Sequence, residues 1–213
     1  MFNAVLFDMD GVLVDSEEFI CKAAIEMFRE KGLNVNPEDF LPFVGAGENR
    51  YIGGVAEKYS YPLDIEKDKA RTYEIYSEIV RGKLVPLPGV IEFIEKCKNH
   101  DLKLAVATSA DKVKMIVNLD EIGIPAETFD ITVNGLQVER KKPFPDIYLK
   151  AAELLDVASE DCLVVEDAPN GIEAGKAAGM KCLGIMSSFS EKELYLADWI
   201  VPDLTQVPDE IWQ

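Results

Sequence analysis

The sequence predicts an α/β fold: a doubly wound parallel sheet with a second, helical domain inserted into it. Short apolar runs typical of buried strands recur at 3–7, 102–107, 129–133, 161–165 and 181–186. Helical patterns separate the later runs, at 89–99, 111–120, 146–156 and 169–178. Strands that alternate with helices are typical of a parallel sheet covered on both faces, and right-handed crossovers complete the doubly wound arrangement.

The exception is the long stretch between the first two predicted strands. Residues 16–83 carry helical patterns and no convincing strand, with apolar residues such as Phe19, Ala23 and Met27 at helical spacing. The segment 86–89, Pro-Leu-Pro-Gly, is typical of a turn and marks the return of the chain to the sheet. We therefore expect a helical cap domain over 16–83 and an α/β core domain over 1–15 and 84–213.

Composition limits the classes of partner. The 213 residues suit one large domain or a core with a modest insertion. The 39 acids outnumber the 22 bases, and this balance argues against nucleic acid or an anionic membrane surface as a partner. No N-terminal signal pattern and no apolar run of about 18 residues is present. We expect a cytoplasmic protein that is a monomer or a weak dimer, with its four separated cysteines as free thiols.

The first apolar run ends in two carboxylates, Asp8 and Asp10, separated by one residue. Ligands of open α/β sheets bind at the carboxyl ends of the strands, where these acids are expected to lie. Two nearby anions repel each other, so such a pair is tolerated only where a cation lies between them or where one acid is protonated. Mg²⁺ is a suitable cation because it prefers carboxylate oxygens. A helix cap or a turn is the alternative role for such aspartates. These residues alone leave both open.

Three more polar clusters follow later strands. Thr108 and Ser109 provide hydroxyls and backbone N–H groups where a helix begins, which is either an anion site or a plain N-cap. Lys142 precedes two prolines that stiffen its loop, so its ammonium is either held in a fixed position or simply solvated. Glu166 and Asp167 close another strand, as a metal site or as a cap. Taken together, the clusters converge on one edge of the sheet and favour a catalytic site.

These motifs, in this order, resemble those of the haloacid dehalogenase superfamily in its phosphatase branch. The resemblance covers nearly the whole chain. It rests on Asp-Met-Asp-Gly at 8–11, Ala-Thr-Ser at 107–109, Lys-Pro-Phe-Pro-Asp at 142–146 and Glu-Asp-Ala-Pro-Asn-Gly at 166–171. The helical insertion resembles the cap of the group that includes phosphoglycolate phosphatases and β-phosphoglucomutases. The resemblance implies a Rossmann-like core under that cap.

The resemblance also implies roles for the two aspartates. Asp8 would attack phosphorus and form an aspartyl-phosphate, which divides one difficult step into two easier ones. Asp10 would protonate the leaving oxygen and later activate the hydrolytic water.

The remaining motifs would hold the phosphate and a metal ion. The resemblance implies that Thr108, the backbone of Ser109 and Lys142 bind phosphoryl oxygens, and that Lys142 also neutralises the nucleophile. Mg²⁺ would take the place of cofactor. Its implied ligands are Asp8, the backbone carbonyl of Asp10 and Asp167, with Glu166 helping either directly or through water.

The function implied is a Mg²⁺-dependent phosphatase acting on a small phosphorylated metabolite, a sugar phosphate. The alternative is a hexose-phosphate mutase like β-phosphoglucomutase, although such mutases carry a histidine on the first cap helix, where this chain reads Glu-Glu-Phe-Ile at 17–20. The chain's only histidine, His100, lies near the end of a predicted core helix. A non-catalytic binding or regulatory protein on the same fold is a third possibility.

Specificity is expected to reside in the cap. A glycine-bearing loop with Gly45 and Gly47 leads into a helix and is expected to face the active site. Arg50 could hold a distal anion of the substrate, although a surface salt bridge is an equal alternative. Glu17, at the start of the first cap helix, is a further candidate.

Overall fold

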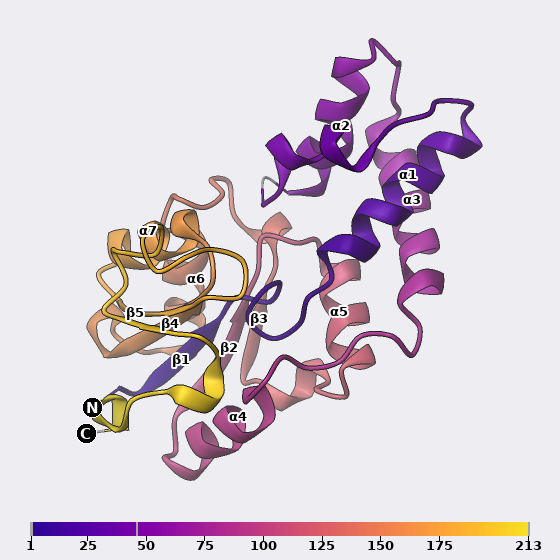
Figure 1. Cartoon of the computed structure of the whole chain (residues 1–213). Helices are drawn as coiled ribbons and strands as arrows, with labels where there is room; N and C mark the ends of the chain where they lie inside the picture. The colour runs from indigo at the N-terminus through magenta and orange to yellow at the C-terminus, as the bar shows by residue number, and fades with distance from the viewer. Residues whose placement is uncertain (1, 46, 213) are drawn as a thin grey trace.

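The computed structural model describes residues 2–45 and 47–212, and it contains one six-stranded parallel sheet in the order β3-β2-β1-β4-β5-β6 (Figure 1). The strands are β1 (Ala4–Phe7), β2 (Lys103–Ala107), β3 (Ile131–Val133), β4 (Cys162–Glu166), β5 (Lys181–Ile185) and β6 (Trp199–Val201). In the central pairing, Leu6 of β1 lies opposite Ala105 of β2 and Val164 of β4. The chain winds outward from β1 in both directions, so the doubly wound prediction is confirmed. The switch point lies between β1 and β4, where ligands of such sheets bind.

Helices cover both faces of the sheet. These core helices are α4 (Val90–Asn99), α5 (Lys112–Glu121), α6 (Asp146–Leu155) and α7 (Pro169–Ala177). Successive side chains of β1 point to opposite faces, so Val5 and Phe7 join the apolar cluster with α4 and α5. Ala4 and Leu6 join the cluster with α6 and α7 on the other face. All four side chains are fully buried, which explains why this strand reads as a continuous apolar run.

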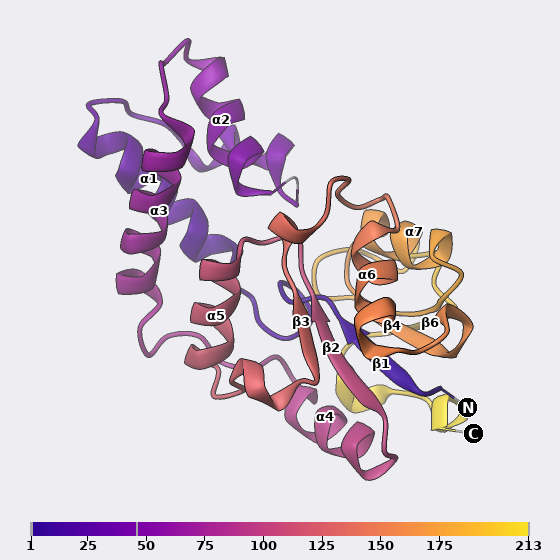
Figure 2. The same ribbon diagram turned by 180° about the vertical axis from the view of Figure 1, so that it is seen from behind.

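The chain between β1 and α4 forms three packed helices above the carboxyl edge of the sheet (Figures 1 and 2). They are α1 (Glu17–Glu30), α2 (Glu48–Lys58) and α3 (Ile65–Val80). Ile20, Met27 and Phe28 line the buried face of α1 at the spacing of an amphipathic helix. The Asp64 carboxylate caps α3 by accepting a hydrogen bond from the Lys67 amide at 3.3 Å. The predicted helical insertion is confirmed.

The two connections between this bundle and the sheet run side by side. The Leu87 amide donates a hydrogen bond of 3.0 Å to the Leu13 carbonyl. Val14 and Pro86 form an isolated antiparallel bridge beside it. The chain therefore enters and leaves the bundle at one point, close to the boundaries at 15/16 and 83/84, and we keep this division into core and cap as a proposal.

The sequence missed one strand. The five predicted strands lie within one or two residues of β1 to β5, but β6 was not predicted. It has three residues, Trp199 to Val201, and Pro202 follows directly. Such a short edge strand has too few residues for a periodic pattern, so only its pairing with β5 identifies it.

Candidate active site

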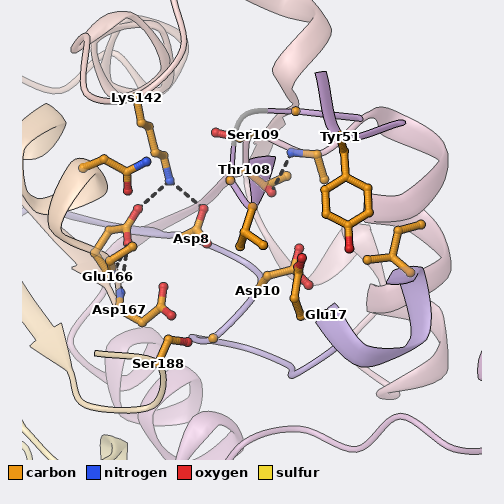
Figure 3. A pocket seen from close by; sticks show the side chains of 18 of the residues that line it. Asp8, Asp10, Glu17, Tyr51, Thr108, Ser109, Lys142, Glu166, Asp167 and Ser188 are labelled. Carbon is orange, nitrogen blue, oxygen red and sulfur yellow. Dashed lines mark hydrogen bonds and ion pairs between the residues drawn. The ribbon is translucent and has the colours of Figure 1, made fainter. Parts of the chain in front are cut away.

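A cavity of about 160 Å³ lies where the carboxyl ends of β1, β2 and β4 meet the cap (Figure 3). The strand ends and the loop before α6 provide its floor, and the start of α1 and the loop before α2 provide its cap side. Nearly all of the site residues predicted from the sequence line it: Asp8, Asp10, Glu17, Gly45, Gly47, Thr108, Ser109, Lys142, Glu166 and Asp167.

Lys142 lies between two carboxylates on the floor of the cavity. Its Nζ is 2.6 Å from Oδ1 of Asp8 and 2.6 Å from Oε1 of Glu166. Burial lowers the pKa of Lys142, but Asp8 and Glu166 outweigh this effect and raise the pKa above its usual value. The ammonium is therefore charged and fixed beside Asp8, which decides between the two roles left open for it: Lys142 is not part of a solvated loop.

Glu166, which holds Lys142 in place, is itself fixed because both of its carboxylate oxygens accept two hydrogen bonds. Its Oε1 also accepts from the Tyr148 hydroxyl at 2.9 Å. Its Oε2 accepts from the backbone amides of Asp167 at 2.9 Å and Ala168 at 3.0 Å. A Cβ at Gly171 would lie 1.7 Å from Oε1, so the first turn of α7 needs a glycine to admit this carboxylate. Both oxygens have two donors, and Glu166 is thus better suited to position Lys142 than to bind a metal ion directly.

Asp8, Glu166 and Asp167 form a buried acidic cluster. One oxygen of each lies within 4.8 Å of the others. Burial raises the pKa of Asp8 to about 7, against the charge of Lys142, and the Glu166 carboxylate adds to the increase. Burial, Glu166 and Asp8 raise the pKa of Asp167 well above its usual range. This surplus of buried negative charge, presented by hard oxygen ligands, fits a divalent cation such as Mg²⁺.

A glycine also makes room for Asp167. Gly11 has a positive φ of 79°, and a Cβ there would lie 2.0 Å from Oδ2 of Asp167. The Asp-Met-Asp-Gly motif therefore needs its glycine both for the turn and for the approach of Asp167, the acid that follows β4.

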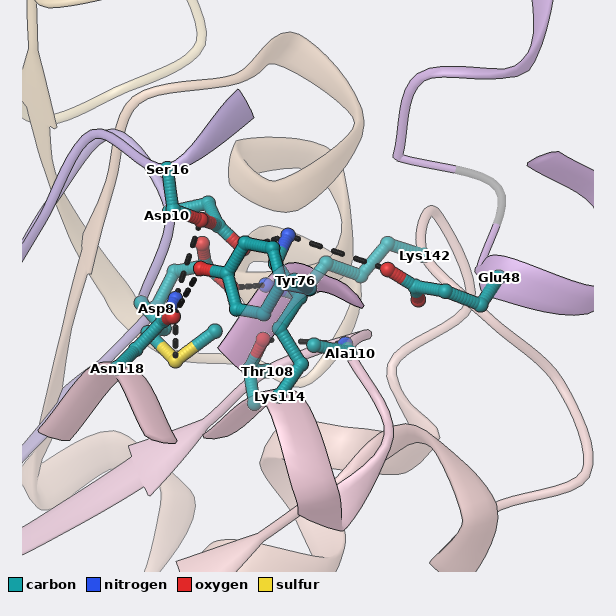
Figure 4. Close-up of polar contacts among 11 residues, drawn as sticks. Asp8, Asp10, Ser16, Glu48, Tyr76, Thr108, Ala110, Lys114, Asn118 and Lys142 are labelled. Atoms are coloured by element: carbon teal, nitrogen blue, oxygen red, sulfur yellow. Dashed lines mark hydrogen bonds and ion pairs between the residues drawn. The ribbon is translucent and has the colours of Figure 1, made fainter. Parts of the chain in front are cut away.

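Asp10 belongs to a separate network on the cap side of the cavity (Figure 4). Its Oδ1 accepts from the Ser16 hydroxyl, and its Oδ2 lies 2.9 Å from the Lys114 ammonium. The Asn118 amide donates to the Ser16 hydroxyl at 3.1 Å, and Asn118 in turn accepts from Tyr76 of the cap. Asp10 is thus held by partners of its own, distinct from those of Asp8.

Thr108 and Ser109 follow β2, as predicted. Thr108 is buried, and its Oγ1 accepts from the Ala110 amide at 3.1 Å. This bond leaves the hydroxyl proton of Thr108 free to donate to a ligand. Neither residue caps α5, because Asp111 occupies the N-cap position.

The structure separates the predicted cap residues. Glu17 lies in the cavity wall, where burial raises its pKa against the opposing charge of Lys114. Arg50 does not line the cavity: its guanidinium is 2.7 Å from Glu57 and stacks on Phe43 at 4.9 Å. The alternative role of Arg50, a surface salt bridge, is the one the structure shows.

Sequence reasoning missed Lys114, Glu48 and Tyr51, which also line the cavity. Lys114 is buried, and burial lowers its pKa while Asp10 and Glu48 outweigh this and raise it. A signal was present: Lys114 and Asn118 are polar residues one turn apart on the face of α5 that also carries the apolar Met115 and Leu119. No comparable signal marks Glu48 or Tyr51.

The fold and the site together define a doubly wound α/β protein with a helical insertion over a buried acidic site. Residues 5–185 match the family model of the haloacid dehalogenase-like hydrolases, so the chain belongs to this family. The predicted resemblance is confirmed.

Three relatives illustrate the similarity. Protein SUPPRESSOR OF QUENCHING 1, chloroplastic, of Arabidopsis thaliana is 42% identical over 89% of this chain, but the match spans only 18% of that relative. The phosphorylated carbohydrates phosphatase of Thermotoga maritima is 32% identical over 91% of this chain and 90% of the relative. A mutant of CbbY from Rhodobacter sphaeroides, solved in complex with xylulose 1,5-bisphosphate, superimposes with a TM-score of 0.87 at 29% identity, covering 97% and 96% of the two chains.

These similarities bear on the other predictions. The homologues include phosphatases, as expected for the enzyme class. Within residues 2–45 and 47–212, no helix is long and apolar enough to cross a membrane. One relative carries the word chloroplastic in its name, so the cytoplasmic location stays a prediction, as does the monomeric or weakly dimeric state.

Proposed function

We propose that the chain is a Mg²⁺-dependent phosphatase that hydrolyses a sugar phosphate or a similar small phosphorylated metabolite through an aspartyl-phosphate on Asp8. The observation that carries the proposal is the position of the Asp8 carboxylate, 2.6 Å from the buried Lys142 ammonium on the floor of the cavity under the cap. The name of the Thermotoga maritima relative, a phosphorylated carbohydrates phosphatase, supports the substrate class.

The proposed reaction has two steps. The Asp8 carboxylate attacks phosphorus, the bond from phosphorus to the ester oxygen breaks, and Asp10 gives a proton to the leaving oxygen. Asp10 then takes a proton from water, which attacks phosphorus and releases phosphate and free Asp8. Lys142, Thr108 and the Ser109 backbone would stabilise the phosphoryl oxygens throughout.

The acidic cluster would hold the metal ion. Asp8, Asp167 and the backbone carbonyl of Asp10 are the proposed ligands, with Glu166 acting through water because both its oxygens are already bonded. Mg²⁺ bound there would neutralise charge on the transferring phosphoryl group.

Phosphate release from p-nitrophenyl phosphate and from a panel of sugar phosphates tests the proposal, with Mg²⁺ and with a chelator. We expect release only with Mg²⁺. Asp8→Asn should abolish it, whereas Asp120→Asn, at an exposed position on α5, should leave it unchanged. Full activity of Asp8→Asn would refute the nucleophile assignment, and no release from any substrate would favour the non-catalytic alternative.

The mutase alternative needs its own assay. With β-glucose 1-phosphate and a catalytic amount of the bisphosphate, a phosphatase releases phosphate and a mutase forms glucose 6-phosphate. The only histidine, His100, is exposed and stacks on Trp212 at the far end of β2, away from the cavity. We therefore expect phosphate.

A further inference from the structure

The cavity over Asp8 has a strong excess of acids. Among its described lining residues, seven carry carboxylates and two carry ammonium groups. Four of the carboxylates belong to the proposed catalytic residues, Asp8, Glu166 and Asp167 on the floor and Asp10 on the cap side. The other three are Asp15, Glu17 and Glu48. No arginine or histidine lines the cavity within the described part of the chain, so any anionic group of a substrate depends on the two lysines.

Both lysines are already engaged. Lys142 contacts Asp8 and Glu166, and only 4% of its side chain is exposed. Lys114 is equally buried and lies 2.9 Å from Asp10 and 3.9 Å from Glu48. Lys142 faces the position of the reacting phosphoryl group. Consequently, neither ammonium is available for a second anionic group elsewhere on the substrate.

The nearby cations of the cap point elsewhere. Arg50 pairs with Glu57 on the outer side of α2. The Lys69 ammonium is 2.9 Å from Asp111 and 2.7 Å from the Asn49 side chain, and it does not line the cavity. Arg71 binds glutamates on the exposed surface of the cap. Among the described residues of the cap, none therefore provides a positive charge for a substrate above the phosphoryl site.

Instead, the cap presents hydrogen-bonding groups. The Tyr51 ring and the Glu17 side chain enter the cavity opposite Lys142 (Figure 3), and Glu48 approaches from the start of α2 (Figure 4). Burial raises the pKa of Glu48 to about 7, against the charge of Lys114, and raises that of Glu17 as well. Carboxyl and phenol groups in this setting can accept from and donate to substrate hydroxyls.

We propose that this cavity selects phosphate monoesters whose remaining part is uncharged and rich in hydroxyls, and that it rejects substrates with a second phosphate or a carboxylate. A second anion would be buried against Glu17 and Glu48 without a cation of its own, which is strongly unfavourable. The proposal rests on the phosphatase function above. It sets this chain apart from the CbbY relative that was solved with a bisphosphate. It also disfavours a mutase, which must hold a bisphosphate during turnover.

Matched substrate pairs test this proposal. Glycerol 3-phosphate and 3-phosphoglycerate differ by a hydroxymethyl against a carboxylate. Glucose 6-phosphate and 6-phosphogluconate differ by the hemiacetal carbon of the sugar against a carboxylate. Fructose 6-phosphate and fructose 1,6-bisphosphate differ by one phosphate. We would measure kcat/KM for each with Mg²⁺, and the inhibition of p-nitrophenyl phosphate hydrolysis by any compound that is not turned over. In each pair, kcat/KM should be at least about tenfold higher for the compound that has no second anionic group.

Two variants assign the discrimination to the cap. Glu48→Gln and Glu17→Gln should each reduce this preference severalfold, mainly by raising kcat/KM for the compound with the second anionic group. Glu18→Gln is the matched control, because Glu18 is the exposed neighbour of Glu17 and pairs with Lys22; it should leave the preference unchanged. The inference would be overturned if the unaltered protein had an equal or higher kcat/KM for the compounds with a second anionic group. Failure to release phosphate from p-nitrophenyl phosphate and from every member of the pairs would instead overturn the phosphatase function itself.

Discussion

The Lys114 ammonium lies 2.9 Å from the Asp10 carboxylate. Lys114 belongs to α5, and no other described residue of this helix lines the cavity. Asp10 is the proposed proton carrier, and its rotamer is fixed by Lys114 on one oxygen and Ser16 on the other. Lys114 and Ser16 thus orient Asp10, as Lys142 orients Asp8. Lys114 is therefore a positioning residue.

Lys114→Met should lower kcat by about ten- to a hundredfold, the loss typical of one hydrogen bond to a charged group in a transition state. KM should change much less, since the phosphoryl group is bound by other residues. Lys114→Arg should restore part of kcat if the charge is what matters. Steady-state kinetics would show this; a rise in KM at constant kcat would mean that Lys114 binds substrate instead.

Stability without metal should fall as pH rises. Burial raises the pKa of Asp8 to about 7 in the folded state, so the native protein binds a proton there that the unfolded chain releases near pH 4. Between these values the folded state holds more protons, and its free energy of unfolding decreases with increasing pH. Glu48, whose pKa burial also raises to about 7, acts in the same direction.

Mg²⁺ should counteract the decrease of the free energy of unfolding with increasing pH. Because the ion competes with protons for Asp8, its affinity should increase from pH 5.5 to pH 8. The increase in Tm on adding Mg²⁺ should therefore be larger at pH 8. Thermal unfolding with Mg²⁺ and with a chelator at both values is the measurement. An increase in Tm that is the same at both would show that Asp8 is already ionised without metal.

The two acids after β4 should fail in different ways. Asp167→Asn should raise the Mg²⁺ concentration for half-maximal activity by about tenfold or more, with much of kcat recovered at saturation. Glu166→Gln should lower kcat at every Mg²⁺ concentration, because it weakens the bond that holds Lys142 beside Asp8. Magnesium titrations of both variants distinguish these outcomes, and identical titration curves would contradict the separate roles.

Gly171→Ala should be more damaging than an ordinary helical substitution. Its Cβ would lie 1.7 Å from Oε1 of Glu166, which is packed between Lys142 and Tyr148 and cannot retreat. We expect a loss of kcat together with a lower Tm. Gly53→Ala in α2 is the control, since its Cβ would meet only the flexible end of Ile65 at 3.2 Å and alanine favours helix by about 1 kcal/mol. A Gly171→Ala enzyme with unchanged kinetics would show that Glu166 can move freely.

The core of the site could be predicted because its residues follow strands. Asp8 and Glu166 lie at the ends of apolar runs, and parallel strands bring such ends to one edge whatever the details of packing. The cap side could not be predicted in the same way. Glu48 and Lys114 come from helices 66 residues apart, and only the packing of the cap on the core brings them within 3.9 Å.

Arg50 shows how a local signal can be overlooked. Glu57 follows it by seven residues, two helical turns, so the two side chains lie on one face of α2 and neutralise each other there. The same spacing argument that predicts the helix also predicts this pair. The partner of a charged residue on its own helix has to be considered before the residue is assigned to a ligand.

The adjacent connections at Val14 and Pro86 also bear on how such a protein can diversify. Because both crossings lie at one place, a different helical bundle could be inserted there without changing the strand order or the positions of Asp8, Glu166 and Asp167, although Asp10 would lose its bond from Ser16. A new bundle would bring different walls to the same chemistry. Substrate selectivity could then be altered through the bundle, provided that the new bundle again supplies a hydrogen-bond donor to Asp10.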